Sequence, residues 1–363
     1  MASIANDKAI IEELTNGSGD IHSLTAYMSY HEIPRDTPIK DIKSKYHNLR
    51  QEAKGIEFAI NYGGDANTIC INKGIPIEEA NKIYKKAEEI SGVEIRKICF
   101  EGPEEELIKT ENAQLAILTT SLAILKVLES QGINADVAVG LSLGEYAALI
   151  YGGYISFEDG IKLIQKRGYY MGNFLPREEY SMAAVIGLEA SKIEEVCNEI
   201  KAEGKFVVPA NYNCSSQTAI SGTSEAIEIA IERLKEAGAR KVVKSKTSGP
   251  FHTEKLQKAS ELFSEELDKV QFGKGNGVGV IKNLDGEFYT EQDNLKEILA
   301  KHIISPVRFD KAIQLMKAQG VTRFIEIGPG KTLTGFVKKD YPEAELHNVN
   351  NLETLEILIK EGE

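Results

Sequence analysis

The chain has 363 residues, of which 42% are hydrophobic and 27% charged, the composition of a globular protein with a substantial buried core. The formal net charge of −12 argues against nucleic acid or an anionic membrane as the main partner. No apolar run approaches the roughly 20 residues of a membrane helix, and the first residues lack a signal-peptide pattern, so we expect a cytoplasmic protein. The four cysteines are scattered, which favours free thiols over disulfides or a zinc site, and the six histidines are equally dispersed, so we expect no metal. We expect no cofactor either.

Two kinds of sequence follow one another along the chain. Residues 1–86 are polar and helical in character. From about residue 93, short apolar runs alternate with helix-like stretches, which is typical of a mostly parallel sheet with helices on both faces. In chain order, the predicted elements are a strand over Ile95–Phe100, a helix over Ala113–Glu129, a strand over Asp136–Leu141, a helix over Glu145–Tyr151, a strand over Arg323–Ile327 and a helix over Lys331–Lys339.

A different order of elements occupies the middle of the chain. We predict strands and helices over Ser181–Ile186 (strand), Ser191–Ala202 (helix), Phe206–Asn211 (strand), Gln217–Ser221 (strand), Ser224–Glu236 (helix) and Arg240–Lys244 (strand). This βαββαβ order is that of a ferredoxin-like unit. We therefore predict a small subdomain at residues 179–246, inserted into a larger α/β body formed by residues 87–178 and 247–348.

A candidate nucleophile lies between a predicted strand and a predicted helix. Gly140-Leu141-Ser142-Leu143-Gly144 matches the pattern G-x-S-x-G. In that setting, small residues on both sides of the serine allow a sharp, strained turn that exposes its hydroxyl. The helix that starts after the serine directs backbone N–H groups at the site, where they would stabilise an oxyanion. The same pentapeptide also occurs by chance, so the interpretation depends on the strand–turn–helix setting.

A serine nucleophile needs a general base. His252 is the candidate, because it follows Ser248-Gly249-Pro250-Phe251, a loop that leads into a helix and can direct a side chain into a cleft. By contrast, His302 and His347 lie in helix-like or terminal surroundings. A surface histidine that caps a helix is the alternative interpretation of His252.

Several motifs together make the chain recognisable from about residue 85 to its end. They are GLSLGEY at 140–146, KRG at 166–168, GPFH at 249–252, SPVR at 305–308 and EIGPGKTLTG at 326–335. This ordered set resembles the malonyl-CoA:acyl carrier protein transacylases of fatty-acid synthesis. The resemblance implies an α/β-hydrolase-like parallel-sheet core that carries the ferredoxin-like subdomain.

The resemblance also implies roles for individual residues. Ser142 would take the malonyl group, and His252 would be its general base. Arg167 would hold the malonyl carboxylate, since a planar guanidinium can form a bidentate, charge-assisted pair that an acetyl group cannot. Without the resemblance, Arg167 would be interpreted as a solvated helix charge.

Further substrate contacts follow from the same resemblance. Leu143 and Asn283 are predicted to lie at the substrate site, together with Asn211, which matches a strand of the small subdomain facing the cleft; Asn213 is nearby. Turn positions are the alternative for both asparagines of that strand. The family has no triad aspartate, and backbone carbonyls orient the histidine. We expect these carbonyls to come from Lys282-Asn283-Leu284.

The implied reaction is a ping-pong transfer of malonyl from malonyl-CoA to the phosphopantetheine thiol of acyl carrier protein. Because the carrier is acidic, we expect it to dock on a local basic patch. Two candidate patches are Arg240, Lys241, Lys244 and Lys246, and Lys331, Lys338 and Lys339. A serine esterase or thioesterase is an alternative, but it would need an acidic triad member and has no use for Arg167.

The N-terminal segment departs from the resemblance. The family opens with a strand ending in a Phe-x-Gly-Gln-Gly type of turn, whose glutamine contributes an N–H to the oxyanion hole. Residues 1–92 contain no such turn, and Tyr62-Gly63-Gly64-Asp65 is the nearest glycine cluster. The missing strand would lie beside the predicted strand that leads to Ser142. Its absence would leave the backbone N–H and C=O groups of its two neighbouring strands without partners. We therefore expect a transacylase with impaired activity.

Residues 1–86 resemble a different family. Arg50, Lys54, Phe58 and Tyr62 recur every fourth residue, like the nucleotide-binding helix of family A DNA polymerases. A plain amphipathic helix is the alternative, and a nucleotide-binding module is a third candidate function. Polymerase activity is not expected, because the metal-binding aspartates are missing. We interpret the chain as a chimaera of a phage-type polymerase fragment and a transacylase.

Overall fold

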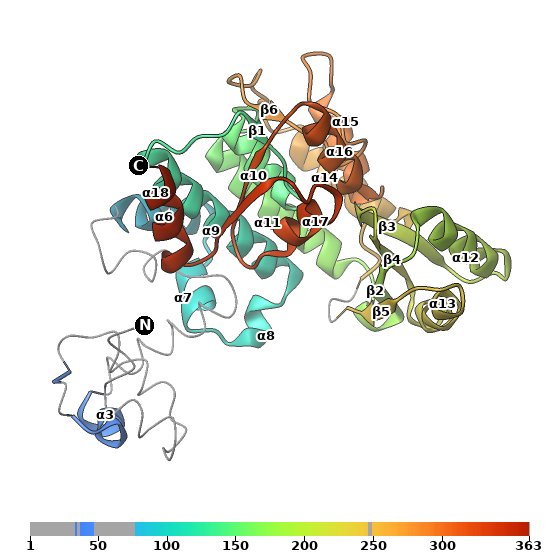
Figure 1. Ribbon diagram of the computed structural model, residues 1–363, viewed down its shortest axis with the longest axis horizontal. Coiled ribbons are helices and arrows are strands. Elements are labelled where there is room, and N and C mark those ends of the chain that lie inside the picture. The colour runs from blue at the N-terminus through green and yellow to red at the C-terminus, as the bar shows by residue number, and fades with distance from the viewer. Residues whose placement is uncertain (1–32, 35–36, 47–76, 246–248, 363) are drawn as a thin grey trace.

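A computed structural model describes residues 33–34, 37–46, 77–245 and 249–362 (Figure 1). The short helix α3 (Ile39–Lys45) belongs to the second of these segments, residues 37–46. The polymerase-like pattern from Arg50 to Tyr62 lies outside the described residues. From residue 77 onward the chain forms a larger unit of helices and parallel strands and a smaller unit built on an antiparallel sheet.

The helix α9 (Thr110–Ser130) lies at the centre of the larger unit and packs against α6 (Ile77–Ser91) and α11 (Phe157–Asn173). Among the described residues, α9 is the one helix long and apolar enough to cross a membrane by length and composition. However, 67% of its apolar window is buried inside the protein. Its role here is that of a core helix.

The segment Ile95–Phe100 is the helix α7, so the prediction of a strand was wrong. Ile95 and Cys99 are four residues apart and both pack on the main hydrophobic cluster, as one face of a helix requires. A strand would have placed Lys97 on the same face. The Glu88 carboxylate accepts the backbone N–H of Arg96 and pairs with its guanidinium, which stabilises the first turn. The helix α8 (Glu104–Leu107) follows.

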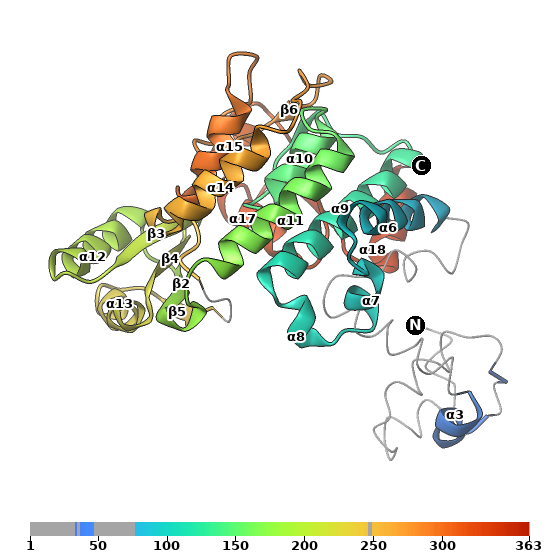
Figure 2. The ribbon, with the colours of Figure 1, turned by 180° about the vertical axis from the view of Figure 1, so that it is seen from behind.

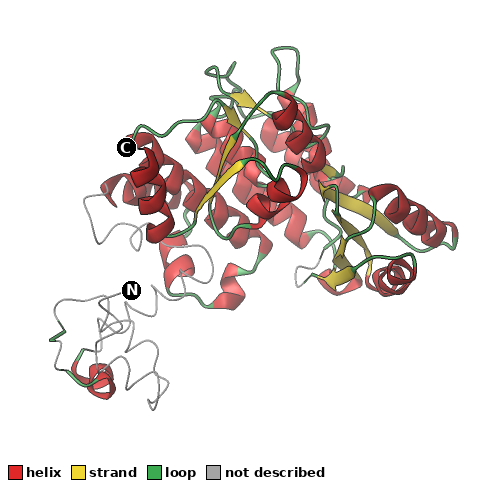
Figure 3. Cartoon of the chain, in the orientation of Figure 1, coloured by secondary structure: helices red, strands yellow, loops and turns green. Residues whose placement is uncertain are grey.

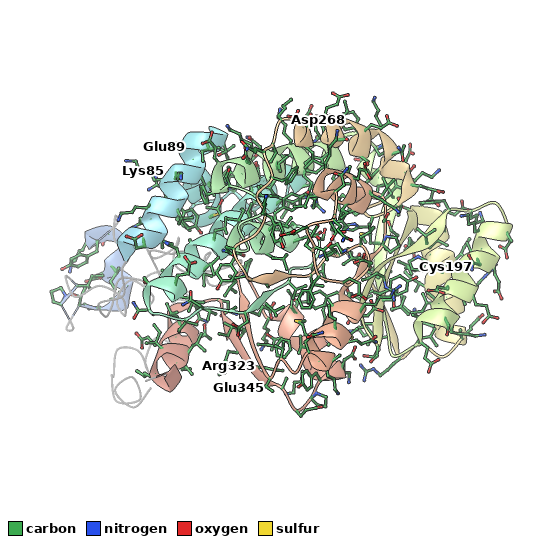
Figure 4. The ribbon with its side chains drawn as sticks, turned by 90° about the horizontal axis from the view of Figure 1, so that it is seen from above. Lys85, Glu89, Cys197, Asp268, Arg323 and Glu345 are labelled. Carbon is green, nitrogen blue, oxygen red and sulfur yellow. The ribbon has the colours of Figure 1, made fainter. Side chains whose placement is uncertain are left out.

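The parallel strands of the larger unit form two separate pairs in the described residues. β1 (Val137–Ala138) pairs with β6 (Gly279–Val280), and β8 (Arg323–Ile327) pairs with β9 (Glu345–Val349). The second pair runs through the middle of the larger unit in Figure 3, and Figure 4 shows Arg323 and Glu345 together on it, with 3.0 Å between Nε and Oε1.

The two pairs share the same two hydrophobic clusters. Ala138 of β1 and Ile325 of β8 belong to the cluster around α9, whereas Val137 and Phe324, their neighbours in sequence, belong to the cluster on the opposite face. Alternation between the same two faces means that both pairs are parts of one sheet layer. The single parallel sheet that we predicted is therefore divided, because no described strand joins β1 to β8.

Helices cover both faces of this divided layer (Figure 3). The remaining helices of the larger unit are α10 (Gly144–Tyr151), α14 (Gln257–Leu267), α15 (Leu295–Ile303), α16 (Phe309–Ala318), α17 (Thr332–Asp340) and α18 (Leu352–Gly362), with the short 3₁₀ turns η2 (Arg177–Glu179) and η3 (Glu254–Leu256). Residues of α10, α14, α15 and α18 join the cluster around α9, and those of α16 and α17 form the opposite one.

The smaller unit has its own core and lies to one side of the larger (Figure 2). Its sheet has the strand order β5-β2-β4-β3-β7, antiparallel except for the parallel β3–β7 pair. Because β7 lies between α15 and α16 of the larger unit, its pairing with β3 ties the two units together. The elements are β2 (Tyr180–Ile186), α12 (Ala190–Ala202), β3 (Val207–Cys214), β4 (Gln217–Thr223), α13 (Ser224–Glu236), β5 (Lys241–Lys244) and β7 (Val307–Arg308).

Candidate active site

A cavity of about 940 Å³ lies between the two units. Its wall includes Ser142 and Leu143 from the turn between β1 and α10, Arg167 from α11, Asn211 from β3 and His252 from the loop before η3. Five residues selected from the sequence therefore face one space, although more than a hundred positions separate the first from the last.

Ser142 lies in a strained turn between β1 and α10. Its φ of 54° is in the left-handed region, which costs a non-glycine residue about 1–2 kcal/mol. A Cβ on Gly140 would come within 2.0 Å of the carbonyl carbon of Gly144, so only glycine fits there. The Asn283 side chain holds the turn closed: its Oδ1 accepts the Ser142 N–H at 2.7 Å, and its Nδ2 donates to the Gly140 carbonyl at 2.6 Å.

His252 is oriented as a base for this serine. Its Nε2 lies 2.7 Å from Ser142 Oγ, and its Nδ1 lies 3.0 Å from the backbone carbonyl of His302. Since a carbonyl can only accept, the proton belongs on Nδ1, and the lone pair of Nε2 faces the hydroxyl. Burial lowers the pKa of His252 well below 6.5, and the neighbouring His302 and Arg167 lower it further.

The orienting carbonyl comes from a different segment than we predicted. It belongs to His302 at the end of α15, rather than to Lys282-Asn283-Leu284. Asn283 itself lies beneath the nucleophile turn, is 2% exposed and does not line the cavity. In the structure it therefore supports the turn, whereas we had predicted a substrate contact.

Arg167 is a buried cation beside the nucleophile. It is 1% exposed, and its Nη2 donates to Ser142 Oγ at 3.0 Å while its Nη1 donates to Gln114 Oε1 at 2.7 Å. Its guanidinium also lies 5.6 Å from the ring centroid of Tyr146. No carboxylate of the described residues forms an ion pair with it. Desolvation is the largest influence and lowers the pKa of Arg167, while the buried Glu145 charge acts on it from further away in the opposite direction. A buried guanidinium without an acidic partner is a site for an anionic ligand.

Comparisons with known proteins agree with this geometry. The acyl transferase domain family matches residues 78–362. Malonyl CoA-acyl carrier protein transacylase of Bacillus subtilis is 40% identical over 284 residues, covering 78% of this chain and 89% of the relative. The Staphylococcus aureus (strain MW2) protein of the same name is 35% identical over 276 residues, covering 76% and 89%. The chain belongs to this transacylase family.

Solved structures of the same family superpose on this transacylase. The Clostridium perfringens enzyme gives a TM-score of 0.78 at 39% identity, covering 83% of this chain and 93% of that one. The Streptococcus pneumoniae enzyme gives 0.76 at 36% identity, covering 84% and 97%. A type II polyketide-synthase malonyl-transacylase in complex with its acyl carrier protein gives 0.75 at 31% identity, covering 78% and 92%.

The family match begins at residue 78. The resemblance to DNA polymerases that we predicted for residues 1–86 therefore receives no support from it. The Phe-x-Gly-Gln-Gly turn, which the family has near its start, would be expected in the same part of the chain.

The transacylase site also contains residues that sequence reasoning missed. Gln114 of α9 accepts from Arg167, and the completely buried Glu145 of α10 lies 2.9 Å from His302 through its Oε2. His302 in turn stacks on His252, with 4.9 Å between ring centroids. Glu145 follows the G-x-S-x-G motif directly, and that position could have drawn attention to it. Gln114 and His302 lie in ordinary helical sequence that gives no signal.

Proposed function

We propose that the protein transfers a malonyl group from malonyl-CoA to the phosphopantetheine thiol of acyl carrier protein. The observation that carries the proposal is Arg167, a buried cation without an acidic partner in the described residues, 3.0 Å from the oxygen of the candidate nucleophile. The free carboxylate of a malonyl group would fit this guanidinium while its thioester carbonyl meets Ser142. The names of the curated relatives and of the carrier-protein complex support the same substrates.

In the first half-reaction, Nε2 of His252 takes the proton of Ser142 while Oγ attacks the thioester carbonyl. The Leu143 N–H at the start of α10 has no acceptor in the described part of the chain, and the helix dipole reinforces it as an oxyanion donor. The tetrahedral intermediate collapses to a malonyl-serine ester. The CoA thiolate then leaves with the proton that His252 carried.

In the second half-reaction, the carrier's thiol enters the cleft that CoA has left. His252 takes the thiol proton, and the thiolate attacks the malonyl-serine ester. Ser142 then recovers its proton from His252, which restores the free enzyme. Arg167 would hold the malonyl carboxylate throughout, so the acyl group keeps its position between the two steps. No cofactor takes part in this scheme, and a cytoplasmic location suits both substrates.

The proposal includes impaired turnover. One oxyanion donor of the family would come from the glutamine turn, which the sequence lacks. Loss of one such donor costs about 10²–10³ in rate. The separation of the pair β1–β6 from the pair β8–β9 also supports impaired turnover. In the described residues β1, the strand before Ser142, is paired on only one side. The proposed origin is a chimaera with a foreign fragment at residues 1–86.

The finer description of the fold is part of the proposal. The order β5-β2-β4-β3 and the sequence βαββαβ support a ferredoxin-like subdomain at residues 179–246. The helix-covered strands β1, β6, β8 and β9 support an α/β-hydrolase-like core at 87–178 and 247–348. For the carrier, the patch at Arg240, Lys241 and Lys244, whose fourth member Lys246 lies outside the described residues, borders the cavity through Lys244. Lys244 also pairs with Glu228.

A serine esterase is the weaker alternative. Such an enzyme would place a carboxylate on Nδ1 of His252, but that nitrogen faces a backbone carbonyl. An esterase would also gain nothing from a buried arginine beside its nucleophile. The nucleotide-binding alternative depends on Arg50, Lys54 and Phe58, which lie outside the described residues.

The test is intact mass spectrometry after brief exposure to malonyl-CoA or acetyl-CoA. We expect a malonyl adduct on the wild-type protein and none on Ser142→Ala. Acetyl-CoA should label the wild type much more slowly, because acetyl has no carboxylate for Arg167. Equal labelling by both donors would favour the esterase, and no labelling of folded protein would refute the transfer reaction.

A further inference from the structure

Beneath the nucleophile and its base lies a second group of buried polar side chains that the proposed reaction does not use. Glu145 and His302 are both 0% exposed. One carboxylate oxygen of Glu145 accepts the backbone N–H of Asn283 at 3.0 Å and the hydroxyl of Tyr289 at 2.9 Å. Glu145 therefore has a fixed position under the turn that carries Ser142.

The second carboxylate oxygen of Glu145 points toward His302. Its Oε2 lies 2.9 Å from Nδ1 of the imidazole, but the ring is not aligned to form a good hydrogen bond along this line. Oε2 and both ring nitrogens of His302 are buried without a hydrogen-bond partner. The close contact between Nδ1 and Oε2 offsets part of the cost of burying these two atoms, whereas Nε2 has no partner, which costs about 1–3 kcal/mol.

His302 contacts the base in two ways. Its backbone carbonyl accepts from Nδ1 of His252 at 3.0 Å, and its ring stacks on the His252 ring at 4.9 Å between centroids with 27° between the planes. A change in the His302 ring would therefore reach the imidazole that faces Ser142. The order of contacts is Glu145, His302, His252 and Ser142, from the interior to the cavity.

We propose that Glu145 and His302 are positioning residues for His252, and that the buried Glu145 charge stabilises the imidazolium that forms when Ser142 is acylated. In an ordinary triad a carboxylate touches the base directly. Here the base meets a carbonyl, and the carboxylate acts one residue further away, through an aromatic stack. The proposal deepens the proposed function, on whose reaction step it depends.

The direction in which the pKa of His252 changes distinguishes an electrostatic role of Glu145 from a packing role. The groups that face His252 are Arg167 from α11, His302 from α15 and the Ser142 hydroxyl; Glu145 from α10 follows behind His302, with Tyr146 and Tyr289 around it. With His302 neutral, removing the Glu145 charge lowers the pKa of His252, because its imidazolium loses a stabilising partner. A packing defect that admits water would instead weaken desolvation and raise this pKa.

The experiment measures how fast Ser142 reacts with phenylmethanesulfonyl fluoride across pH 4–9. In this reaction Oγ bonds to sulfur, fluoride leaves, and His252 takes the hydroxyl proton. The probe has no carboxylate, so it tests the serine and its base without the Arg167 site. Malonyl-CoA labelling is measured in parallel, so that failure of the proposed function and failure of this inference can be told apart.

Glu145→Gln keeps the shape of the side chain and an acceptor for Tyr289, but it removes the charge. We expect its sulfonylation to slow by about 10- to 100-fold, and the acid limb of its rate profile to move to lower pH. Malonyl-CoA labelling should slow by the same factor, with an unchanged half-saturating concentration. His302→Gln, which keeps the backbone carbonyl, should also slow both reactions. It provides the test of the inference if Glu145→Gln does not fold.

The matched control is Glu266→Gln on α14, where the carboxylate accepts from Tyr170 and pairs with Lys269. It should react like the wild type. An unchanged rate in both test variants, or an acid limb that moves to higher pH in Glu145→Gln, would overturn the inference. A wild-type Ser142 that reacts no faster than ordinary surface serines would overturn it as well.

Discussion

Substitution of Arg167 by methionine tests the proposed selectivity for a charged acyl group. Methionine fills a similar volume without charge. The substitution removes the two guanidinium N–H groups that donate to Ser142 Oγ and Gln114 Oε1. A bidentate guanidinium–carboxylate pair contains two charge-assisted bonds, each worth about 1.5–3 kcal/mol net. Part of this free energy is offset, because without substrate the same N–H groups already donate to Ser142 and Gln114.

We take about 3 kcal/mol as the net loss for malonyl, which is about a 150-fold decrease in the rate constant over half-saturating concentration. Acetyl makes no such pair, so its labelling should change by less than about 10-fold. The assay is single-turnover labelling by quenched-flow mass spectrometry with both donors, and Lys166→Met, the neighbouring position on α11, is the control. Equal losses for malonyl-CoA and acetyl-CoA would refute the role of Arg167 as the carboxylate site.

Three further predictions concern the strained turn and the buried base. Ser142→Gly and Ser142→Ala should both abolish labelling, and Ser142→Gly should be about 1 kcal/mol more stable than Ser142→Ala in urea unfolding, because both lose the Oγ contacts but only glycine adopts a φ of 54° without strain; equal stability of the two variants would contradict it. Gly140→Ala should destabilise by about 3 kcal/mol or lower soluble yield, because its Cβ would overlap the Gly144 backbone at 2.0 Å. Native His252 stays neutral where its unfolded counterpart protonates, so its contribution to stability is present above pH 6.5 and is lost as pH falls toward its lowered native pKa. His252→Gln should flatten this part of the urea stability profile, and an unchanged slope between pH 6.5 and 5 would contradict the assignment.

The motif-bearing residues could be predicted because local chemistry limits what can stand there. A serine at positive φ between a strand and a helix needs a glycine two positions earlier, and the sequence provides Gly140. His252 also has a positive φ, of 59°, in a Gly-Pro loop. The glycines and the proline beside these two residues are visible in a single sequence, whereas the positive φ of His252 itself was not predicted.

The supporting residues could not be predicted, because their roles arise from packing between distant elements. Gln114 and His302 lie on helices whose sequences only encode an apolar face. Asn283 was noticed, but its side chain supports the turn from below, since the chain brings β6 and the following loop under Ser142. Ile95–Phe100 was assigned to a strand because a short apolar run does not distinguish a strand from a buried helix.

The divided sheet also has a consequence for handling the protein. In the described residues, the edges of β1 and β8 offer backbone N–H and C=O groups without ladder partners, and β8 leaves Phe324, Ile325 and Ile327 only partly covered. An apolar strand with a free edge readily pairs with another extended chain. The gap between β1 and β8 should therefore take up an extended segment of another molecule, and concentrated protein should associate in this way. The association would remove active molecules from solution without any change at Ser142, and specific activity would fall as protein concentration rises.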